Sequence, residues 1–289
     1  MNELRITTVQ TDLIWENKIE NLSKFDGLLR GIKRGETDVI VLPEMFTTGF
    51  SMNPAAFAET MDDATVFWLK KKAWELDAAI TGSFICVEND KYYNRLVWMQ
   101  PDGTFSIYDK RHRFTLAGED RYYTEGVERL IVEWRGWRIC PLICYDLRFP
   151  VWARNGLQKA KNEGKEAKNK GQNANSNKQE AIGKVQVDYD VLIYVANWPI
   201  ARSHHWRILS EARAVENQTY VVAVNRVGTD ANGYEYRGDT SVIDYAGEIL
   251  LRRSFTEGVD TTIVSKEKLR NYRKKFGFLA DQDTFEINL

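Results

Sequence analysis

Two short runs of consecutive apolar residues limit the folds available to this chain of 289 residues. They lie within the predicted strands 38–42 (DVIVL) and 189–196 (YDVLIYVA), the second being purely apolar over 191–196. A strand with apolar side chains on both faces has to be covered on both faces, which is typical of sheets that pack against helices. We therefore expect both runs to be strands inside the molecule, with helices outside them.

Strand-like and helix-like segments alternate along the rest of the chain. Apolar residues at helical spacing predict a helix over 17–32, a second after a cap at Asp62 or Asp63, and a third capped by Ser203 that ends at Asn217. Further strands are predicted at 4–10, 79–87, 93–100, 104–108, 130–134, 137–143, 220–227 and in a hairpin over 239–251. This order predicts one α/β domain, residues 1–289, with mixed sheets and a charged surface tail at 266–275.

The segment 158–184 interrupts this pattern, because it is rich in Lys, Asn and Gly and nearly free of large apolar residues. Such a segment buries too little apolar surface to offset its ordering entropy, so we expect an exposed, mobile insertion. Its lysines could contact nucleic acid, but a solvated loop is the preferred interpretation.

The amino-acid composition limits the kinds of molecule that this protein is expected to bind. Forty basic and forty-one acidic residues give a formal net charge of −1, so no overall field attracts nucleic acid or an anionic membrane. The apolar runs are far shorter than the roughly 20 residues that span a bilayer. The first residues lack a signal-peptide pattern, and three cysteines suit a reduced compartment. We expect a cytoplasmic protein with a small-molecule partner.

Three chemically distinct side chains stand at the ends of predicted strands: Glu44, Lys110 and Cys144. They could meet at one rim of the sheets. A carboxylate, an ammonium and a thiol are together sufficient for acyl transfer: the carboxylate takes the thiol proton, the cation stabilises the thiolate and later the oxyanion, and the sulfur attacks a carbonyl. Singly, each has a simpler explanation, as a core cysteine, a turn or a surface ion pair.

Other reactive side chains lack comparable partners. Cys140 lies four residues before Cys144, but no CxxC or Cys/His cluster accompanies it, so a buried apolar role is favoured over a redox or metal pair. His204 and His205 are adjacent on a predicted helix and point apart, and His112 is the only other histidine. No GxGxxG or Walker A pattern supports nucleotide binding.

Three segments resemble, in order and spacing, the signature segments of the nitrilase superfamily of carbon–nitrogen hydrolases: VLPEMFTTGF (41–50), YDKRHRF (108–114) and LICYDLRFP (142–150). The resemblance runs from about residue 4 to residue 251. It implies a four-layer αββα sandwich that forms a homodimer and uses neither a metal nor an organic cofactor. The insertion at 158–184 departs from the family pattern, near the region through which relatives associate.

The resemblance also implies roles for individual residues. Glu44, Lys110 and Cys144 would be the catalytic triad, with Lys110 and the backbone N–H of Tyr145 holding the oxyanion. Glu119 stands where many members carry a second acidic residue that positions the lysine and the substrate. Asp146 and Arg148 would brace the nucleophile loop through charge-assisted hydrogen bonds.

Segments 195–199, 205–228 and 237–250 are most similar to the ω-amidase branch, which hydrolyses 2-oxoglutaramate and related ω-amides of dicarboxylic acids. The remote carboxylate of such a substrate needs a cationic partner, for which Arg202 is the candidate, with a surface ion pair as the alternative. The predicted pocket walls are Phe46, Phe114 and Trp198. The other open readings are an amidase, carbamoylase or nitrilase with a different small substrate, and a binding protein that has lost turnover.

Overall fold

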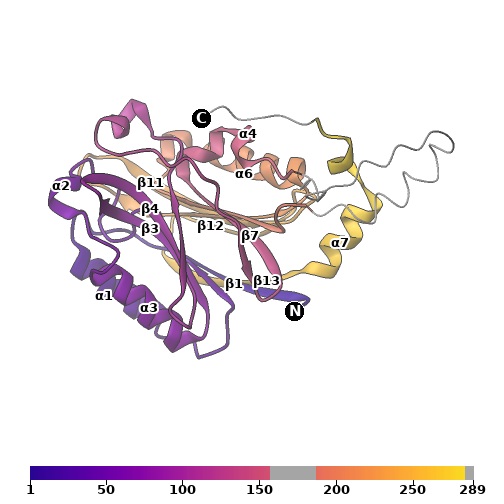
Figure 1. The fold of residues 1–289 in the computed structure, drawn as a ribbon, viewed down its shortest axis with the longest axis horizontal. Coiled ribbons are helices and arrows are strands. Elements are labelled where there is room, and N and C mark those ends of the chain that lie inside the picture. Colours follow the sequence, from indigo (N-terminus) through magenta and orange to yellow (C-terminus); the bar gives the residue numbers. More distant parts are fainter. Residues whose placement is uncertain (157–186, 284–289) are drawn as a thin grey trace, which may run out of the picture.

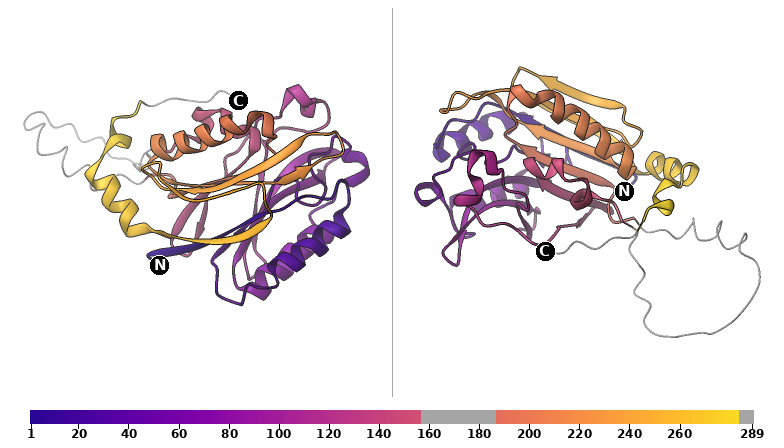
Figure 2. Two further views of the ribbon diagram at one scale, coloured as in Figure 1. Left: turned by 180° about the vertical axis from the view of Figure 1, so that it is seen from behind. Right: turned by 90° about the horizontal axis from the view of Figure 1, so that it is seen from above.

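The computed structural model describes residues 1–156 and 187–283. The predicted insertion at 158–184 lies outside these residues, so its exposure stays a prediction. Two β-sheets pack face to face between two layers of helices (Figures 1 and 2). The predicted αββα sandwich is confirmed.

The six-stranded sheet has the order β13 (Gly258–Ser265), β1 (Glu3–Gln10), β2 (Val39–Val41), β3 (Ala79–Glu88), β4 (Lys91–Met99) and β5 (Phe105–Asp109). The seven-stranded sheet has the order β10 (Val227–Thr229), β11 (Glu235–Ile243), β9 (Tyr220–Asn225), β8 (Val191–Ala196), β7 (Trp137–Ile143) and β6 (Val132–Trp134), and β12 (Ile249–Ser254) pairs with β11. Strands β1, β2 and β3 are parallel, as are β7, β8 and β9.

Helices α1 (Lys18–Leu29) and α3 (Ala64–Leu76) cover the first sheet, whereas α4 (Pro150–Ala153) and α6 (Ser203–Asn217) cover the second (Figure 1). Two further helices are α2 (Pro54–Phe57) and α7 (Lys266–Lys275). Across the described ranges, none of the helices has the length and apolarity that a membrane span requires.

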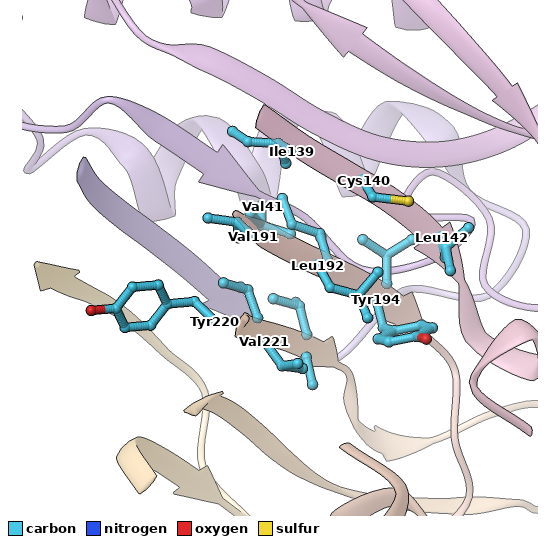
Figure 3. Close-up of a cluster of buried hydrophobic side chains, with 14 of the residues drawn as sticks. Val41, Ile139, Cys140, Leu142, Val191, Leu192, Tyr194, Tyr220 and Val221 are labelled. Carbon is cyan, nitrogen blue, oxygen red and sulfur yellow. The ribbon is translucent and has the colours of Figure 1, made fainter. Parts of the chain in front are cut away.

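Strand β2 consists of apolar residues because both of its faces are buried. Val39 and Val41 belong to the core between the sheets, which also contains Val191 of β8; Figure 3 labels Val41 and Val191 in this cluster. Ile40 and Leu42 belong instead to the cluster beneath α1 and α3. Both faces of the strand are thus covered by apolar side chains, as the sequence predicted.

Four details differ from the sequence prediction. Helix α6 begins at Ser203 and its N-cap is Arg202, so Ser203 is not the cap. The strand predicted over 220–227 divides into β9 and β10 at Arg226. Strand β13 was not predicted. The charged tail at 266–275 forms α7, in which Leu269 is fully buried.

Candidate active site

The predicted triad assembles where several strands end. Glu44 follows β2, Lys110 directly follows β5 and Cys144 directly follows β7. The Lys110 Nζ lies 2.9 Å from Glu44 Oε1 and 2.9 Å from each carboxylate oxygen of Glu119. Glu44, Glu119 and Lys110 are almost completely buried. A single ammonium therefore bridges two buried carboxylates.

The backbone turns sharply at both reactive segments. Cys144 has φ of 42° and Met45, directly after Glu44, has φ of 43°. Residues with side chains adopt this left-handed conformation at a cost on the order of 1–3 kcal/mol, and such positions cluster at functional sites. Cys144 opens a 3₁₀ turn, Cys144–Arg148, which turns the chain away from β7 immediately after the thiol.

Asp146 fixes the loop that carries Cys144. This fully buried carboxylate accepts hydrogen bonds from the backbone N–H of Ile143 (3.0 Å) and from the hydroxyl of Tyr108 (2.7 Å). It also accepts one from the backbone N–H of His112 at 3.0 Å, and the Nδ1 of that ring lies 2.8 Å away. Asp146 thereby ties the lysine segment to the nucleophile segment, and its predicted bracing role is confirmed.

Arg148, predicted to brace the same loop, instead faces a cavity. Its guanidinium lies 4.8 Å from the ring centre of Trp198, and its Nη2 lies 3.1 Å from Nδ1 of His205. The loop is held from the other side by buried Arg213, whose Nη2 donates to the Leu147 carbonyl at 2.6 Å. The bracing arginine therefore comes from α6, not from the loop itself.

Burial and charge set the protonation states of the site. Burial, followed by the charge of Glu44, raises the pKa of Cys144 well above its usual value, and Lys110 only partly opposes this. Burial alone would lower the pKa of Lys110, but the charges of Glu119 and Glu44 outweigh it and raise that pKa. Burial, opposed by Lys110 and reinforced by Glu44, raises the pKa of Glu119. The resting site therefore holds a protonated thiol beside a charged ammonium.

The other two cysteines, Cys86 and Cys140, are fully buried. Burial raises the pKa of Cys86 to about 11 and that of Cys140 to about 12. Cys140 packs in the core between the sheets, where Figure 3 shows it among Ile139, Leu142 and neighbouring strands. Cys144, by contrast, is 9% exposed and lines a cavity.

A cavity of about 80 Å³ opens onto Cys144. Its wall is mainly aromatic and apolar, with Asn197 and two arginines as polar members; the residues are Phe50, Phe114, Leu116, Ala117, Tyr145, Arg148, Asn197, Trp198, Pro199, Arg202, Tyr234 and Tyr236. Predicted site residues Phe114, Tyr145, Trp198 and Arg202 lie in this wall. A pocket with apolar walls and a few polar groups is typical of small-molecule sites.

Phe46, also predicted to line the pocket, does not. It is fully buried and packs against Phe25 and Trp68, with ring centres 5.5 and 5.9 Å apart, in the core beneath the helices. The left-handed turn at Met45 places Phe46 on the side away from the cavity. Phe50, four residues later, lines the wall and lies 5.1 Å from Lys110 Nζ.

The two arginines of the cavity wall contact aromatic rings and pair with no carboxylate of the described residues. Arg202 lies 5.2 Å from the ring centre of Phe114, as Arg148 lies over Trp198. Within residues 1–156 and 187–283, neither guanidinium has a carboxylate within 4.0 Å, unlike most arginines of this protein. A surface ion pair, the alternative considered for Arg202, is therefore not found there.

Two asparagines contact Glu44 that sequence reasoning did not identify. Asn94 of β4 donates from Nδ2 to Glu44 Oε1 at 2.8 Å. Asn197, directly after β8, donates its backbone N–H to Glu44 Oε2 at 2.8 Å and its Nδ2 to the Glu44 carbonyl at 2.7 Å. The position of Asn197 at the end of a buried strand was the available signal. Asn94 lies inside a predicted strand and gave none.

Within the part of the chain that the structure describes, no three His, Cys, Asp or Glu side chains gather in a way that could hold a metal ion.

The chain is similar in sequence to members of one protein family. The profile of the carbon–nitrogen hydrolases matches residues 5–162 and 185–274. The chain is 44% identical to omega-amidase YafV of Escherichia coli K12 over 289 residues, covering 99% of this chain and 100% of that protein. It is 30% identical to 2-oxoglutaramate amidase of Bacillus subtilis, covering 96% of each.

A solved structure agrees with the sequence matches. XC1258 of Xanthomonas campestris, a CN-hydrolase superfamily protein described with an arsenic adduct in its active site, superposes with a TM-score of 0.90 at 40% identity. The match covers 100% of both chains. The chain therefore belongs to the carbon–nitrogen hydrolases of the nitrilase superfamily.

Proposed function

We propose that this carbon–nitrogen hydrolase is a cysteine-dependent ω-amidase, which converts small ω-amides of dicarboxylic acids, such as 2-oxoglutaramate, into acid and ammonia. The observation that carries the proposal is a cavity lined by the Cys144 thiol and by two guanidinium groups, of Arg148 and Arg202, that pair with no carboxylate among the described residues. The full-length similarity to omega-amidase YafV and to 2-oxoglutaramate amidase supports the same substrate class.

In the proposed reaction, Glu44 takes the Cys144 proton while the sulfur bonds to the amide carbon and the carbonyl electron pair moves to oxygen. Lys110 and the Tyr145 backbone N–H stabilise that oxyanion. Glu44 then gives its proton to the nitrogen, the C–N bond breaks and ammonia leaves. Water loses a proton to Glu44 and attacks the thioester. The C–S bond breaks, and Glu44 returns the proton to sulfur.

Glu119 is proposed as a supporting residue. It bonds Lys110 through both oxygens and accepts the backbone N–H of Phe114 at 2.5 Å. Through these contacts it fixes the ammonium and also one wall of the cavity. Phe114 and Trp198 are proposed to bind substrate, because they hold the two arginines in place by cation–π contacts.

Ammonia release from a substrate panel tests the proposal. The panel contains 2-oxoglutaramate, a neutral aliphatic amide of similar length, an N-carbamoyl amino acid and an aliphatic nitrile. We expect kcat/KM to be highest for 2-oxoglutaramate. A preference for the carbamoyl compound or the nitrile would assign a different substrate class, and no release from any of them would favour a binding protein.

Arg202 is proposed to bind the remote carboxylate of the substrate. Arg202→Ala should raise KM for 2-oxoglutaramate by about 10–100-fold, because a charge-assisted hydrogen bond contributes about 1.5–3 kcal/mol. KM for the neutral amide should change by less than about twofold if only the carboxylate contact is lost. Steady-state kinetics on both substrates measure the difference.

Arg121→Ala is the matched control, because Arg121 is exposed and does not line the cavity. It should leave both KM values unchanged. Equal increases for the charged and the neutral amide in Arg202→Ala would remove Arg202 from this role, and Arg148 would become the candidate.

A homodimer is proposed to form through the outer face of α4 and α6. Val151 of α4 and Ile208 and Val215 of α6 are about half exposed on this face, and burying such side chains favours association. Sedimentation should give a molecular mass of twice the 33.5 kDa of one chain. Ile208→Glu should give a monomer, because it places a charge in the proposed apolar interface. Phe67→Glu, on α3 of the opposite layer, should leave the dimer intact. A monomeric wild type would contradict the proposal.

The cytoplasmic location remains a prediction from sequence.

A further inference from the structure

The hydrogen bonds to Glu44 distinguish its two carboxylate oxygens. A carboxylate offers about four lone-pair directions. Oε1 accepts from Lys110 Nζ at 2.9 Å and from Asn94 Nδ2 at 2.8 Å, so both of its directions are used. Oε2 accepts only the backbone N–H of Asn197, at 2.8 Å, among the described residues. One lone pair therefore remains available, and it belongs to Oε2.

Asn94 lies outside the cavity and contacts the residues that surround the thiol. It is 1% exposed and does not line the cavity, so it does not touch substrate. Its Nδ2 lies 3.4 Å from Glu119 Oε1 in addition to its bond to Glu44, and its backbone carbonyl accepts the N–H of Lys110 at 3.0 Å. Asn94 thus contacts the carboxylates of Glu44 and Glu119 through its side chain and Lys110 through the backbone.

The neutrality of Asn94 matters as much as its position. Glu44 and Glu119 are two buried carboxylates that share one ammonium. A second cation there would compete for Glu44, whereas a third carboxylate would repel both. An amide supplies a donor without changing the charge, and its Oδ1 is buried without a hydrogen-bond partner among the described residues. Burying Oδ1 without a partner is unfavourable. The hydrogen bonds that Nδ2 donates must therefore contribute more than this cost.

We propose that Asn94 is a positioning residue for proton transfer. Together with Lys110 it saturates Oε1 of Glu44, so that Oε2 is the oxygen that exchanges protons with Cys144, the leaving nitrogen and the incoming water. This inference rests on the proposed function. In each transfer the S–H, N–H or O–H bond is broken or made at Oε2, and Oε1 stays bound to its two donors.

Asn94→Asp and Asn94→Ser test the proposal. The first keeps the shape and replaces the amide donor by an acceptor, and the second replaces the amide by a shorter side chain whose hydroxyl does not extend to the position of Nδ2. In both, kcat should fall by about 10–100-fold while KM changes by less than about threefold, because the lost bond is to a charged group that does not touch substrate. The acid limb of the kcat/KM profile should move to higher pH, because the ionised carboxylate loses a donor.

A second readout does not depend on the substrate. The rate at which iodoacetamide alkylates Cys144 should fall in both variants, with the same displacement along the pH axis. If the wild type releases no ammonia from any amide, the proposed function fails, but the alkylation rates still test the path from Cys144 to Glu44.

Asn155→Ala is the control, because Asn155 is an equally buried asparagine whose bonds to Asp188, Tyr189 and Asn217 lie at the opposite end of β8 from Asn197. It should lower the melting temperature without moving either pH profile. A folded Asn94→Ser enzyme with wild-type kcat and an unmoved acid limb would overturn the proposal. If Asn94→Asp does not fold, Asn94→Ser decides the outcome.

Discussion

Ammonia release by Cys144→Ala is expected to fall by at least about 10³-fold, because removing the nucleophile costs this much or more in enzymes with a covalent intermediate. Cys144 is the one cysteine of the three that lines the cavity. Mass spectrometry of wild-type enzyme quenched during turnover should find the acyl group on Cys144, and Cys144→Ala should carry none.

Cys140→Ala is the control for this prediction. Cys140 is a fully buried member of the core between the sheets, four residues earlier on the same segment. Its replacement removes one sulfur from a packed core, so it should lower the free energy of unfolding by about 1 kcal/mol and leave kcat nearly unchanged. Acylation of Cys86 or Cys140, or turnover by Cys144→Ala, would show that the wrong thiol had been assigned.

The parts of the site that could be predicted from sequence are those that follow buried strands. The apolar run of β2 and the run that ends at Ile143 fix where the chain leaves the sheets, so Glu44 and Cys144 could be placed at strand ends. Lys110 follows the second strand of a predicted hairpin in the same way. The family resemblance then supplied their common location, which spacing alone could not give.

The parts that could not be predicted depend on backbone torsion or on pairing across the chain. The direction of Phe46 follows from the left-handed φ of Met45, which no side-chain pattern reveals. Asn94 is one polar residue within a strand, and only the pairing of β4 between β3 and β5 places it behind Glu44. Strand β13 is an edge strand of mostly half-buried residues, and it pairs with β1 from the other end of the chain.

Lys110→Met should destabilise the protein as well as inactivate it. The substitution leaves Glu44 and Glu119 buried without their shared cation, and breaking a buried pair in this way typically costs about 3–5 kcal/mol. Activity should fall by a factor on the order of 10²–10³, because the proposed oxyanion donor is lost. Urea unfolding and ammonia release measure the two effects separately.

The pH dependence of this variant has a definite sign. The pKa of Glu119 is already raised in the folded wild type, from a usual value of 4.5, and Lys110 opposes that rise. Without Lys110 the folded state should hold the proton to still higher pH. A carboxyl group with a raised pKa in the folded state binds more protons there than in the unfolded chain. The free energy of unfolding of Lys110→Met should therefore be closest to that of wild type below about pH 4.5 and should decline as pH rises through the folded pKa.

The double variant Lys110→Met, Glu119→Gln separates charge from catalysis. Replacing Glu119 by its neutral isostere removes one of the two unpaired charges, whereas Glu44 keeps its donors from Asn94 and Asn197. About half of the lost free energy of unfolding should return at pH 8, and the pH dependence should weaken. Activity should not return, because the ammonium that is proposed to stabilise the oxyanion is still absent. If Lys110→Met were as stable as wild type from pH 5 to pH 8, the folded state would not depend on Lys110 to hold the two buried carboxylates, and this role of the shared cation would have to be abandoned.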